Sequence, residues 1–292
     1  MNEKKIYALG FFDGVHLGHQ ALLEKTRQLA GALGCRCSAV TFDLPPHSVL
    51  RQKNPLMITT LQYRLSLLRS FGMDDVLVLN ADNETLSTPW RSFLDRLPDC
   101  AGFVCGEDFR FGHRGEGDAP KLQQYAAEQG LCCAIVPQQD LEGERISSTR
   151  IRLLLEQGEI EKANQLLGHP YALTGTVQPG HQLGRTLGLP TANLLLPNEL
   201  LKPAFGVYCC RATVEGKCYS AVTNIGVRPT VSGNGITVES ILLDFEGDLY
   251  GKELHLDFFH FLRPEKKFNS LPDLQQEIRK NREETRKFFE NM

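Results

Sequence analysis

The order of apolar segments along this chain constrains its fold more than any other feature of the sequence. In the first half, short apolar runs that predict buried strands alternate with segments whose apolar residues recur at helical spacing. Strands that alternate with helices in this way form a parallel sheet with both faces covered, so we expect an α/β, Rossmann-like domain. The expected strands cover residues 6–12, 35–42, 74–80, 101–106 and 131–138, and the expected helices cover 19–34, 58–72, 88–97 and 119–130.

The second half of the chain has a different pattern of predicted helices and strands. Residues 148–168 predict two short helices that are interrupted at Gly158. Beyond them, many short β-type segments are separated by glycine-containing turns, which is typical of a small antiparallel β-barrel, and a last helix ends the chain. We therefore expect two domains, residues 1–168 with the parallel sheet and residues 169–292 with the barrel and the terminal helix.

The composition is that of a folded protein without a polyanionic partner. At roughly 100–200 residues per domain, a chain of 292 residues suggests two domains. With 32 Lys and Arg against 35 Asp and Glu, the net charge is −3, whereas binding to nucleic acid or anionic membranes requires a basic excess. No apolar run approaches the roughly 18 residues of a membrane helix, and the first run is too short for a secretory signal. We expect a cytoplasmic protein with neither nucleic-acid nor membrane partners.

The cysteines do not indicate a disulfide framework. Their number is odd, two pairs are adjacent in sequence, and no CxxC spacing occurs, so a zinc site is not favoured either. Buried free thiols in a reducing compartment are the simpler hypothesis. The nine residues are Cys35, Cys37, Cys100, Cys105, Cys132, Cys133, Cys209, Cys210 and Cys218.

The first expected strand leads into a glycine-rich turn that carries two histidines. A turn of this kind before a helix presents free backbone N–H groups and the positive end of the helix dipole, which favour a phosphate group. His16 and His19 are three residues apart, and imidazoles on one face are able to donate hydrogen bonds to a phosphoryl group as its charge shifts. A polar surface pair is the alternative, but the strand-to-helix position favours a phosphate site. The turn consists of Gly10, Phe11, Phe12, Asp13 and Gly14.

The sequence contains neither a P-loop pattern nor the GxGxxG dinucleotide fingerprint. The string GFFDGVHLGHQ instead resembles the HxGH nucleotidyltransferases. Further motifs follow in order, and the ordered set is similar, over nearly the whole chain, to the prokaryotic bifunctional riboflavin kinase/FAD synthetase family. These motifs are TFD (41–43), GEDFRFG (106–112), RISSTRIR (145–152), GRTLGLPTANL (184–194), NIGVRPT (224–230), VESILLDFEGDLYG (238–251) and LRPEKKF (262–268).

For the first domain, the resemblance implies transfer of an adenylyl group from ATP to FMN, which gives FAD and pyrophosphate. The FMN phosphate is already a nucleophile, so positioning and charge stabilisation are the tasks left to the protein. His16 and His19 match the HxGH pair and are expected to contact the ATP phosphates. The SSTR motif, a pyrophosphate clamp in this interpretation, is matched by Ser147, Ser148, Thr149 and Arg150. Flavin-binding positions are matched by Asp43, Asp108 and Phe109, the last with core packing as an alternative.

The second expected site contains Thr191 and Asn193. In an extended segment these side chains share one face, and their neutral oxygens suit a phosphate-bound Mg²⁺. From the residues alone a turn motif is the simpler interpretation, whereas the resemblance implies the ATP–Mg²⁺ site of riboflavin kinase. Upstream, Gly180 and Gly184 allow close backbone approach to phosphate, and Arg185 adds positive charge.

Glu239 matches the family's general base for the conversion of riboflavin and ATP into FMN and ADP. A primary alcohol is a poor nucleophile, and a carboxylate within reach accepts its proton as the γ-phosphoryl group transfers. Taken alone, a glutamate in a strand usually faces solvent, and only the motif favours the catalytic role. Arg263 and the terminal helix are expected to border the isoalloxazine ring.

Two positions depart from the family pattern. After the second strand the family usually reads Thr-Phe-acidic-Pro-His-Pro, whereas this chain has Leu44 and Pro45, with a histidine only at His47. In the second domain, the usual histidine two residues after the base is Ile241. The first departure concerns the placement of FMN, and the second concerns contacts to the flavin.

The combined prediction is a bifunctional enzyme that makes FMN and then FAD, with ATP as co-substrate and Mg²⁺ as cofactor. Riboflavin, FMN and FAD are its substrates and products, and we expect a monomer or a weak homo-oligomer. One alternative is a riboflavin kinase with an impaired adenylyltransferase domain, which the missing histidine motivates. Another is a non-catalytic flavin sensor, although a sensor needs no general base. A cytidylyl- or pantetheine-type transferase would leave the second domain unexplained.

Overall fold

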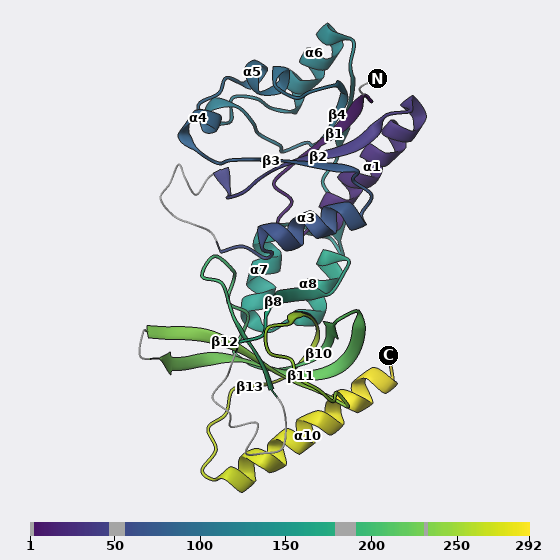
Figure 1. The fold of residues 1–292 in the computed structure, drawn as a ribbon. Coiled ribbons are helices and arrows are strands. Elements are labelled where there is room, and N and C mark those ends of the chain that lie inside the picture. The colour runs from purple at the N-terminus through teal and green to yellow at the C-terminus, as the bar shows by residue number, and fades with distance from the viewer. Residues whose placement is uncertain (1–2, 47–55, 179–190, 231–232) are drawn as a thin grey trace. The chain divides into compact units, whose positions relative to one another are not determined.

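A computed structural model of the chain describes residues 3–46, 56–178, 191–230 and 233–292. The chain divides into two compact units, Met1–Ser148 and Thr149–Met292 (Figure 1). The sequence predicts the helices before residue 168 in the first domain, whereas by their packing they go with the second unit, apart from Ser148. The functional boundary near residue 168 stays a prediction, because packing alone does not say which chemistry these helices serve.

The first unit is built on a five-stranded sheet with the order β3-β2-β1-β4-β5, in which all neighbouring strands are parallel. This confirms the parallel sheet predicted from the alternating pattern. All five strands end at the same edge, where sheets of this kind bind their ligands. The elements are β1 (Lys5–Leu9), α1 (Leu17–Leu33), β2 (Arg36–Phe42), α3 (Leu61–Ser70), β3 (Asp75–Leu79), α4 (Asn83–Leu86), α5 (Trp90–Asp95), β4 (Cys100–Gly106), the 3-10 turn η1 (His113–Gly115), α6 (Ala119–Gln129), β5 (Cys132–Val136) and the hairpin β6 (Asp140–Leu141) and β7 (Glu144–Arg145).

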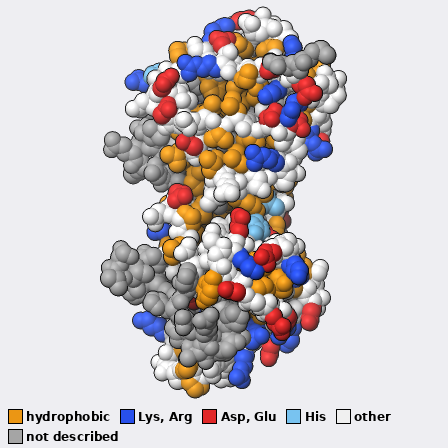
Figure 2. Space-filling model, viewed as in Figure 1, with side chains coloured by type: hydrophobic (Ala, Val, Ile, Leu, Met, Phe, Trp, Pro, Cys, Tyr) orange, Lys and Arg blue, Asp and Glu red, His pale blue; other side chains and the backbone are white. Residues whose placement is uncertain are grey.

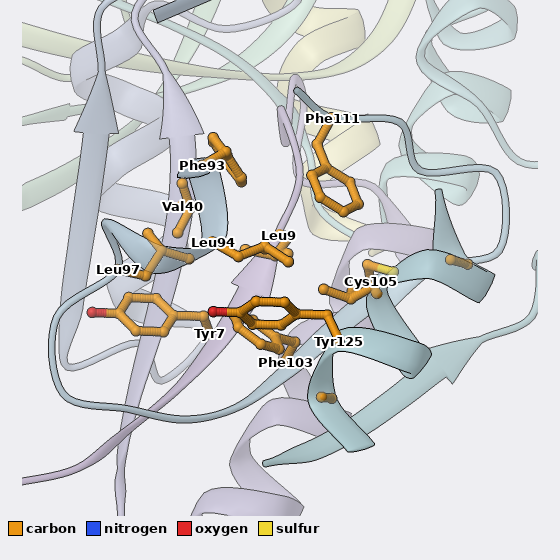
Figure 3. Close-up of a cluster of buried hydrophobic side chains, with 13 residues drawn as sticks. Tyr7, Leu9, Val40, Phe93, Leu94, Leu97, Phe103, Cys105, Phe111 and Tyr125 are labelled. Carbon is orange, nitrogen blue, oxygen red and sulfur yellow. The ribbon is translucent and has the colours of Figure 1, made fainter. Parts of the chain in front are cut away.

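Alternating side chains of the strands build a core on each face of this sheet. Tyr7 and Leu9 of β1 point to one face, and Figure 3 shows them packed with Leu94 of α5 and Tyr125 of α6. The intervening Ala8 belongs to the cluster on the opposite face, which α1 and α3 cover. With both faces shielded from water, β1 is a rigid base for the loop that follows it.

Local signals in the sequence account for several helix ends. The Thr60 side chain accepts the Tyr63 N–H at the start of α3, and the Asp118 side chain accepts the Lys121 N–H at the start of α6. Helix α1 ends at Gly34, whose φ of 63° lies in the left-handed region that glycine adopts without strain. These ends confirm the expected helices to within a few residues.

The second unit contains a six-stranded antiparallel sheet with the order β8-β13-β10-β11-β12-β9. The backbone N–H of Gln178, just after β8, donates to the Asn193 carbonyl of β9 at 2.8 Å, so the two edges meet and the sheet curls into the predicted small barrel. The elements are α7 (Ser148–Gln157), α8 (Ile160–Leu167), β8 (Tyr171–Thr176), β9 (Thr191–Leu195), β10 (Gly206–Val214), β11 (Lys217–Thr230), β12 (Gly233–Leu242), β13 (Glu253–Pro264) and α10 (Leu271–Glu290).

Polar residues form the most buried part of the terminal helix α10. Asn281 is 1% exposed and accepts a hydrogen bond from Arg263 Nε at 3.0 Å. Thr285 is fully buried, and its hydroxyl lies 3.3 Å from the Cys209 sulfur of β10. Specific polar contacts therefore fix this helix on the barrel, in addition to its apolar contacts.

Candidate active sites

The loop after β1 has a strained backbone. Phe12 and Val15 have positive φ angles of 59° and 40°, and both side chains are 0% exposed. Gly10 leaves room for the Phe12 ring, since a Cβ at this glycine would lie 2.9 Å from Phe12 Cζ. Backbone strain of this kind concentrates at functional sites and persists only where the surrounding structure enforces it.

Asp13 is the residue that ties this loop to the segment before α3. Its carboxylate is 1% exposed and accepts hydrogen bonds from the Ile58 N–H at 3.0 Å, the Thr59 N–H at 3.1 Å and the Thr59 hydroxyl at 3.2 Å. The Gly14 N–H donates in turn to Thr59 Oγ1 at 3.2 Å. A buried anion satisfied in this way supports the loop, so its contribution to phosphate binding is indirect.

His16 is the N-cap of α1, and this fixes where its proton lies. Its Nδ1 accepts the backbone N–H of His19 at 3.3 Å. A neutral imidazole that accepts at Nδ1 carries its proton on Nε2, so the Nε2–H group is the donor it offers to a ligand. A Cβ at Gly18 would lie 3.2 Å from His16 Cε1, which explains why a glycine separates the two histidines.

The two histidine rings are stacked, with centroids 3.6 Å apart and planes 14° apart. The Phe12 ring packs edge-on against His19 at 5.2 Å. Burial lowers the pKa of His19 well below its usual value, and the neighbouring His16 and Arg64 lower it further. His19 is therefore neutral near pH 7, and the stacked pair places two imidazoles at a helix N-terminus.

The start of α7 meets the same loop. Ser148 Oγ donates to the Asp13 carbonyl at 3.0 Å, which brings the beginning of the SSTR motif to the histidine loop. Ser147 beside it is half-buried. Thr149 and Arg150 belong to the second unit by their packing, so their expected role as a clamp rests on the resemblance alone.

The residues expected near the flavin of the first domain have different surroundings. Asp43 accepts two backbone N–H groups, at 2.7 and 2.8 Å, and so shapes the end of β2. The exposed carboxylate of Asp108 pairs with Arg145. Phe109 stacks on the buried Phe111, with centroids 5.6 Å apart, so core packing accounts for part of its role.

The second site is a row of side chains across three antiparallel strands. Asn193 of β9 lies directly opposite Glu239 of β12, which lies directly opposite Asn224 of β11. Opposite residues share a face with Cβ atoms about 4.5–5.5 Å apart, so these three side chains are neighbours. Thr191 lies on the same face, one row along, opposite Ile241. Nothing in the sequence singles out Asn224, although it belongs to the NIGVRPT motif, and only the strand register reveals its position.

Asn193 has an oxygen that is suited to a cation. Its Nδ2 donates to the Thr191 carbonyl at 3.4 Å, while its buried Oδ1 has no hydrogen-bond donor among the described residues. Buried polar atoms without a partner are rare in folded proteins, and a carbonyl oxygen in that position fits a hard cation. The described residues hold no cluster of three or more His, Cys, Asp or Glu for a metal.

Arg263 anchors one wall of an open cleft of about 690 Å³ beside α10. Its Nε lies 3.2 Å from Glu277 Oε1, and its guanidinium carbon lies 5.8 Å from the centre of the Phe268 ring. Both partners line the cleft, together with Lys266 and Lys280. The cleft has the size of a small-molecule site and offers aromatic, cationic and anionic groups.

The remaining residues singled out in the sequence are either outside the described part of the chain or belong to the two departures from the family pattern. Gly180, Gly184, Arg185 and His47 lie outside the described residues. Pro45 is buried, whereas Leu44 is 45% exposed at the end of β2. Ile241 packs against a core cluster formed by Val207, Val222 and Leu243, so this departure from the family pattern is part of the barrel's interior.

Comparisons with known proteins match a separate family model to each half of the chain. The FAD synthetase family model matches residues 1–150, and the riboflavin kinase family model matches residues 167–289. The bifunctional riboflavin kinase/FMN adenylyltransferase of Listeria monocytogenes is 36% identical over 98% of this chain and 92% of its own length. The Bacillus subtilis and Escherichia coli proteins of that name are each 34% identical, over 99% and 97% of this chain and 94% and 92% of their own.

The fold also has a close structural match. A crystal structure described as a macrolide-efflux protein from Streptococcus pneumoniae gives a TM-score of 0.88 at 29% identity, covering 98% of this chain and 95% of that one. Among the described helices, none has the length and apolar character that crossing a bilayer requires. A parallel-sheet nucleotidyltransferase domain followed by a flavokinase barrel defines a class of two-domain transferases of flavin cofactor synthesis. The chain belongs to the bifunctional riboflavin kinase/FMN adenylyltransferase family.

Proposed function

We propose that the two activities of this family are carried out by two separate constellations of this chain. The barrel phosphorylates riboflavin to FMN, with Glu239 as the general base, and the first unit adenylylates FMN to FAD, with His16 and His19 on the ATP phosphates. The observation that carries the proposal is that the histidine pair lies within the first unit at a helix N-terminus, whereas Glu239 lies within the second unit on a strand register. The alternatives of a sensor or an impaired transferase are not favoured.

In the first unit, the residues bind and stabilise charge and form no covalent intermediate. The N-terminus of α1 and the Nε2–H of His16 face the developing charge as the FMN phosphate attacks the α-phosphorus of ATP in line. Pyrophosphate is the leaving group, and we assign its clamp to Ser147, Ser148, Thr149 and Arg150. The neighbouring Asp108 and Phe109 are assigned to the flavin side, and Asp43 to the shape of that site.

In the second unit, Glu239 accepts the proton of the riboflavin 5′-hydroxyl as the γ-phosphoryl group of ATP is transferred. Asn224 and Asn193, on either side of it, supply neutral groups that orient the carboxylate and the phosphates. Arg263, through Glu277 and Phe268, shapes the cleft that we assign to the isoalloxazine ring.

We assign Mg²⁺ to Thr191 and Asn193. The Oδ1 of Asn193, which no described residue donates to, and the position of Thr191 two residues earlier on the same face support this assignment. A bound Mg²⁺ would neutralise charge on the ATP phosphates, since Mg²⁺ is usually held by one or two protein oxygens together with substrate phosphates. Gly180, Gly184 and Arg185 remain assigned to the phosphates by the resemblance alone.

The setting of the enzyme is also a proposal. All nine cysteines are free thiols, which supports a reducing, cytoplasmic location. Basic and acidic side chains are interspersed on the face shown in Figure 2, which supports small-molecule substrates and no nucleic-acid partner. We propose a monomer or a weak homo-oligomer.

A chromatographic time course with riboflavin, ATP and Mg²⁺ tests the proposal, with a second run that starts from FMN. We expect FMN to appear first and then to convert into FAD, and FMN alone to give FAD in the second run. FMN that accumulates in both runs would identify a kinase with an impaired transferase, with Pro45 as the first suspect. Absence of turnover for either flavin, oxidised or reduced, would favour the sensor.

A further inference from the structure

Arg64 in α3 is the largest fully buried side chain in the described part of the chain, with 0% exposure. Its Nη2 donates to the Phe42 carbonyl at 2.6 Å and, more weakly, to the Asp43 carbonyl at 3.4 Å, both at the end of β2. Its Nε and Nη1 have no acceptor among the described residues. A buried guanidinium with unpaired donors destabilises a fold, so a role beyond packing is needed to explain it.

Arg64 keeps its positive charge although its side chain is buried. Desolvation lowers the pKa of the guanidinium to about 10, and the carboxylates of Asp13 and Asp43 oppose this effect. At neutral pH the group is therefore a cation, held inside the protein close to the ligand edge of the sheet. Leu67 and Leu68 of the same helix belong to an apolar cluster, whose packing requires no charge.

The surroundings of this cation connect it to the histidine loop. Its guanidinium carbon lies 4.4 Å from the centre of the Phe11 ring, in the cation–π range, and Phe11 belongs to the loop after β1. The Phe11 carbonyl in turn accepts the Thr41 hydroxyl at 2.8 Å, which joins the loop to β2. Arg64 also contributes to the low pKa of His19, so its field reaches the histidine pair.

We propose that Arg64 is a positioning residue for adenylyl transfer, which supplies from beneath the loop a fixed positive charge for the ATP phosphates. It holds the Phe11 ring and the end of β2 in place and acts through the loop and through its field, because the side chain is shielded from solvent. This inference rests on the proposed placement of the ATP phosphates at His16 and His19. A fixed charge in a water-excluded site stabilises developing charge without reorganisation.

Two variants separate charge from packing. Arg64→Gln keeps a donor for the Phe42 carbonyl and removes the charge, whereas Arg64→Lys keeps the charge and loses the planar fork. The KM for ATP and the kcat of FAD formation from FMN are measured for each full-length protein, with riboflavin phosphorylation as the internal control for folding. We expect Arg64→Gln to raise the KM for ATP by about tenfold or more, and Arg64→Lys to stay within about threefold of the wild type.

A second readout responds to charge and not to packing. The titration of His19 is followed by NMR with ¹³C-labelled histidine, with assignment from a His19→Gln sample. Besides Arg64 of α3, the described groups in contact with this ring are the His16 imidazole, which is ionisable, and the Phe12 ring, which carries no charge. We expect the pKa of His19 to rise in Arg64→Gln and to stay low in Arg64→Lys.

The outcomes test the role of the Arg64 charge separately from the placement of the ATP phosphates at His16 and His19. If the two variants impair FAD formation and ATP binding equally, or if neither variant impairs them, the proposed role of the charge is overturned. If Arg64→Gln does not fold, Arg64→Lys decides alone: near-normal KM for ATP supports the proposal, and a loss as large as that of His19→Ala overturns it. An unchanged FAD rate in His19→Ala would instead refute the placement of the phosphates, and the inference with it.

Discussion

The two phosphate sites proposed for this chain are held in place by different means. In the first unit, a short loop with two strained residues is fixed by a buried carboxylate and presents a helix N-terminus. In the second unit, Asn193, Glu239 and Asn224 are neighbours because three strands are in register. The site in the first unit, called the loop site below, depends on the few buried residues that hold its loop. The site in the second unit depends on the pairing of strands across the whole sheet. Mutations should therefore separate the two sites in activity and in stability.

The largest effect is expected for Glu239→Gln, which leaves the strand register intact and removes the proposed general base. Riboflavin phosphorylation should fall by about 10²–10⁴-fold, the usual contribution of general-base catalysis, while FAD formation from supplied FMN continues. Glu246→Gln, at an exposed carboxylate in the same unit, is the matched control and should change neither rate. Initial rates of both reactions provide the measurement, and a parallel loss of both activities would contradict the division into two sites.

His19→Ala is the corresponding change in the loop site. Loss of one donor aimed at transition-state charge usually lowers kcat by about 10²–10³-fold, so FAD formation should drop to that extent. The kinase rate of the same protein is the control and should be unchanged. Because His19 also packs against Phe12, the thermal transition of the variant is recorded in parallel. An FAD rate near that of the wild type would show that the phosphates bind elsewhere.

Asp13→Asn tests whether the loop depends on its buried support. The carboxylate accepts two backbone N–H groups and a hydroxyl, and hydrogen bonds to a charged group contribute about 1.5–3 kcal/mol each. We expect the free energy of unfolding of the first unit to fall by about 2–3 kcal/mol in urea titrations. Asp82→Asn is the control: this Asp caps α4 at the surface, where both residues cap well, so the free energy of unfolding should stay close to that of the wild type. Equal effects in the two variants would mean that burial of Asp13 contributes nothing.

The same contrast explains what the sequence could and could not predict. The strands and helices of the first unit follow from apolar periodicity, and the histidine loop follows from local spacing, because neighbours in sequence are neighbours in a strand–turn–helix unit. Asn224 and the pairing of Asn193 with Glu239 depend on register between distant strands, which local pattern does not encode. The sequence does not indicate a role for Arg64, because a charged residue in a helix is usually solvated. Only the fold shows that this side chain is buried beneath the loop.

The smallest expected effect is a dependence of stability on pH that the loop site alone contributes. Burial, followed by His16 and Arg64, holds the pKa of folded His19 well below its usual value, whereas the unfolded chain binds a proton near pH 6.5. Below that pH the unfolded state therefore holds more protons at this site, so stability is full above pH 6.5 and is lost as the pH falls. Between pH 7 and 5.5, the first unit should lose about 1 kcal/mol from this residue, and His19→Gln should remove that part of the loss. Urea titrations of both proteins at these two pH values provide the test, and identical pH dependences would mean that His19 takes up its proton equally in the folded and unfolded states.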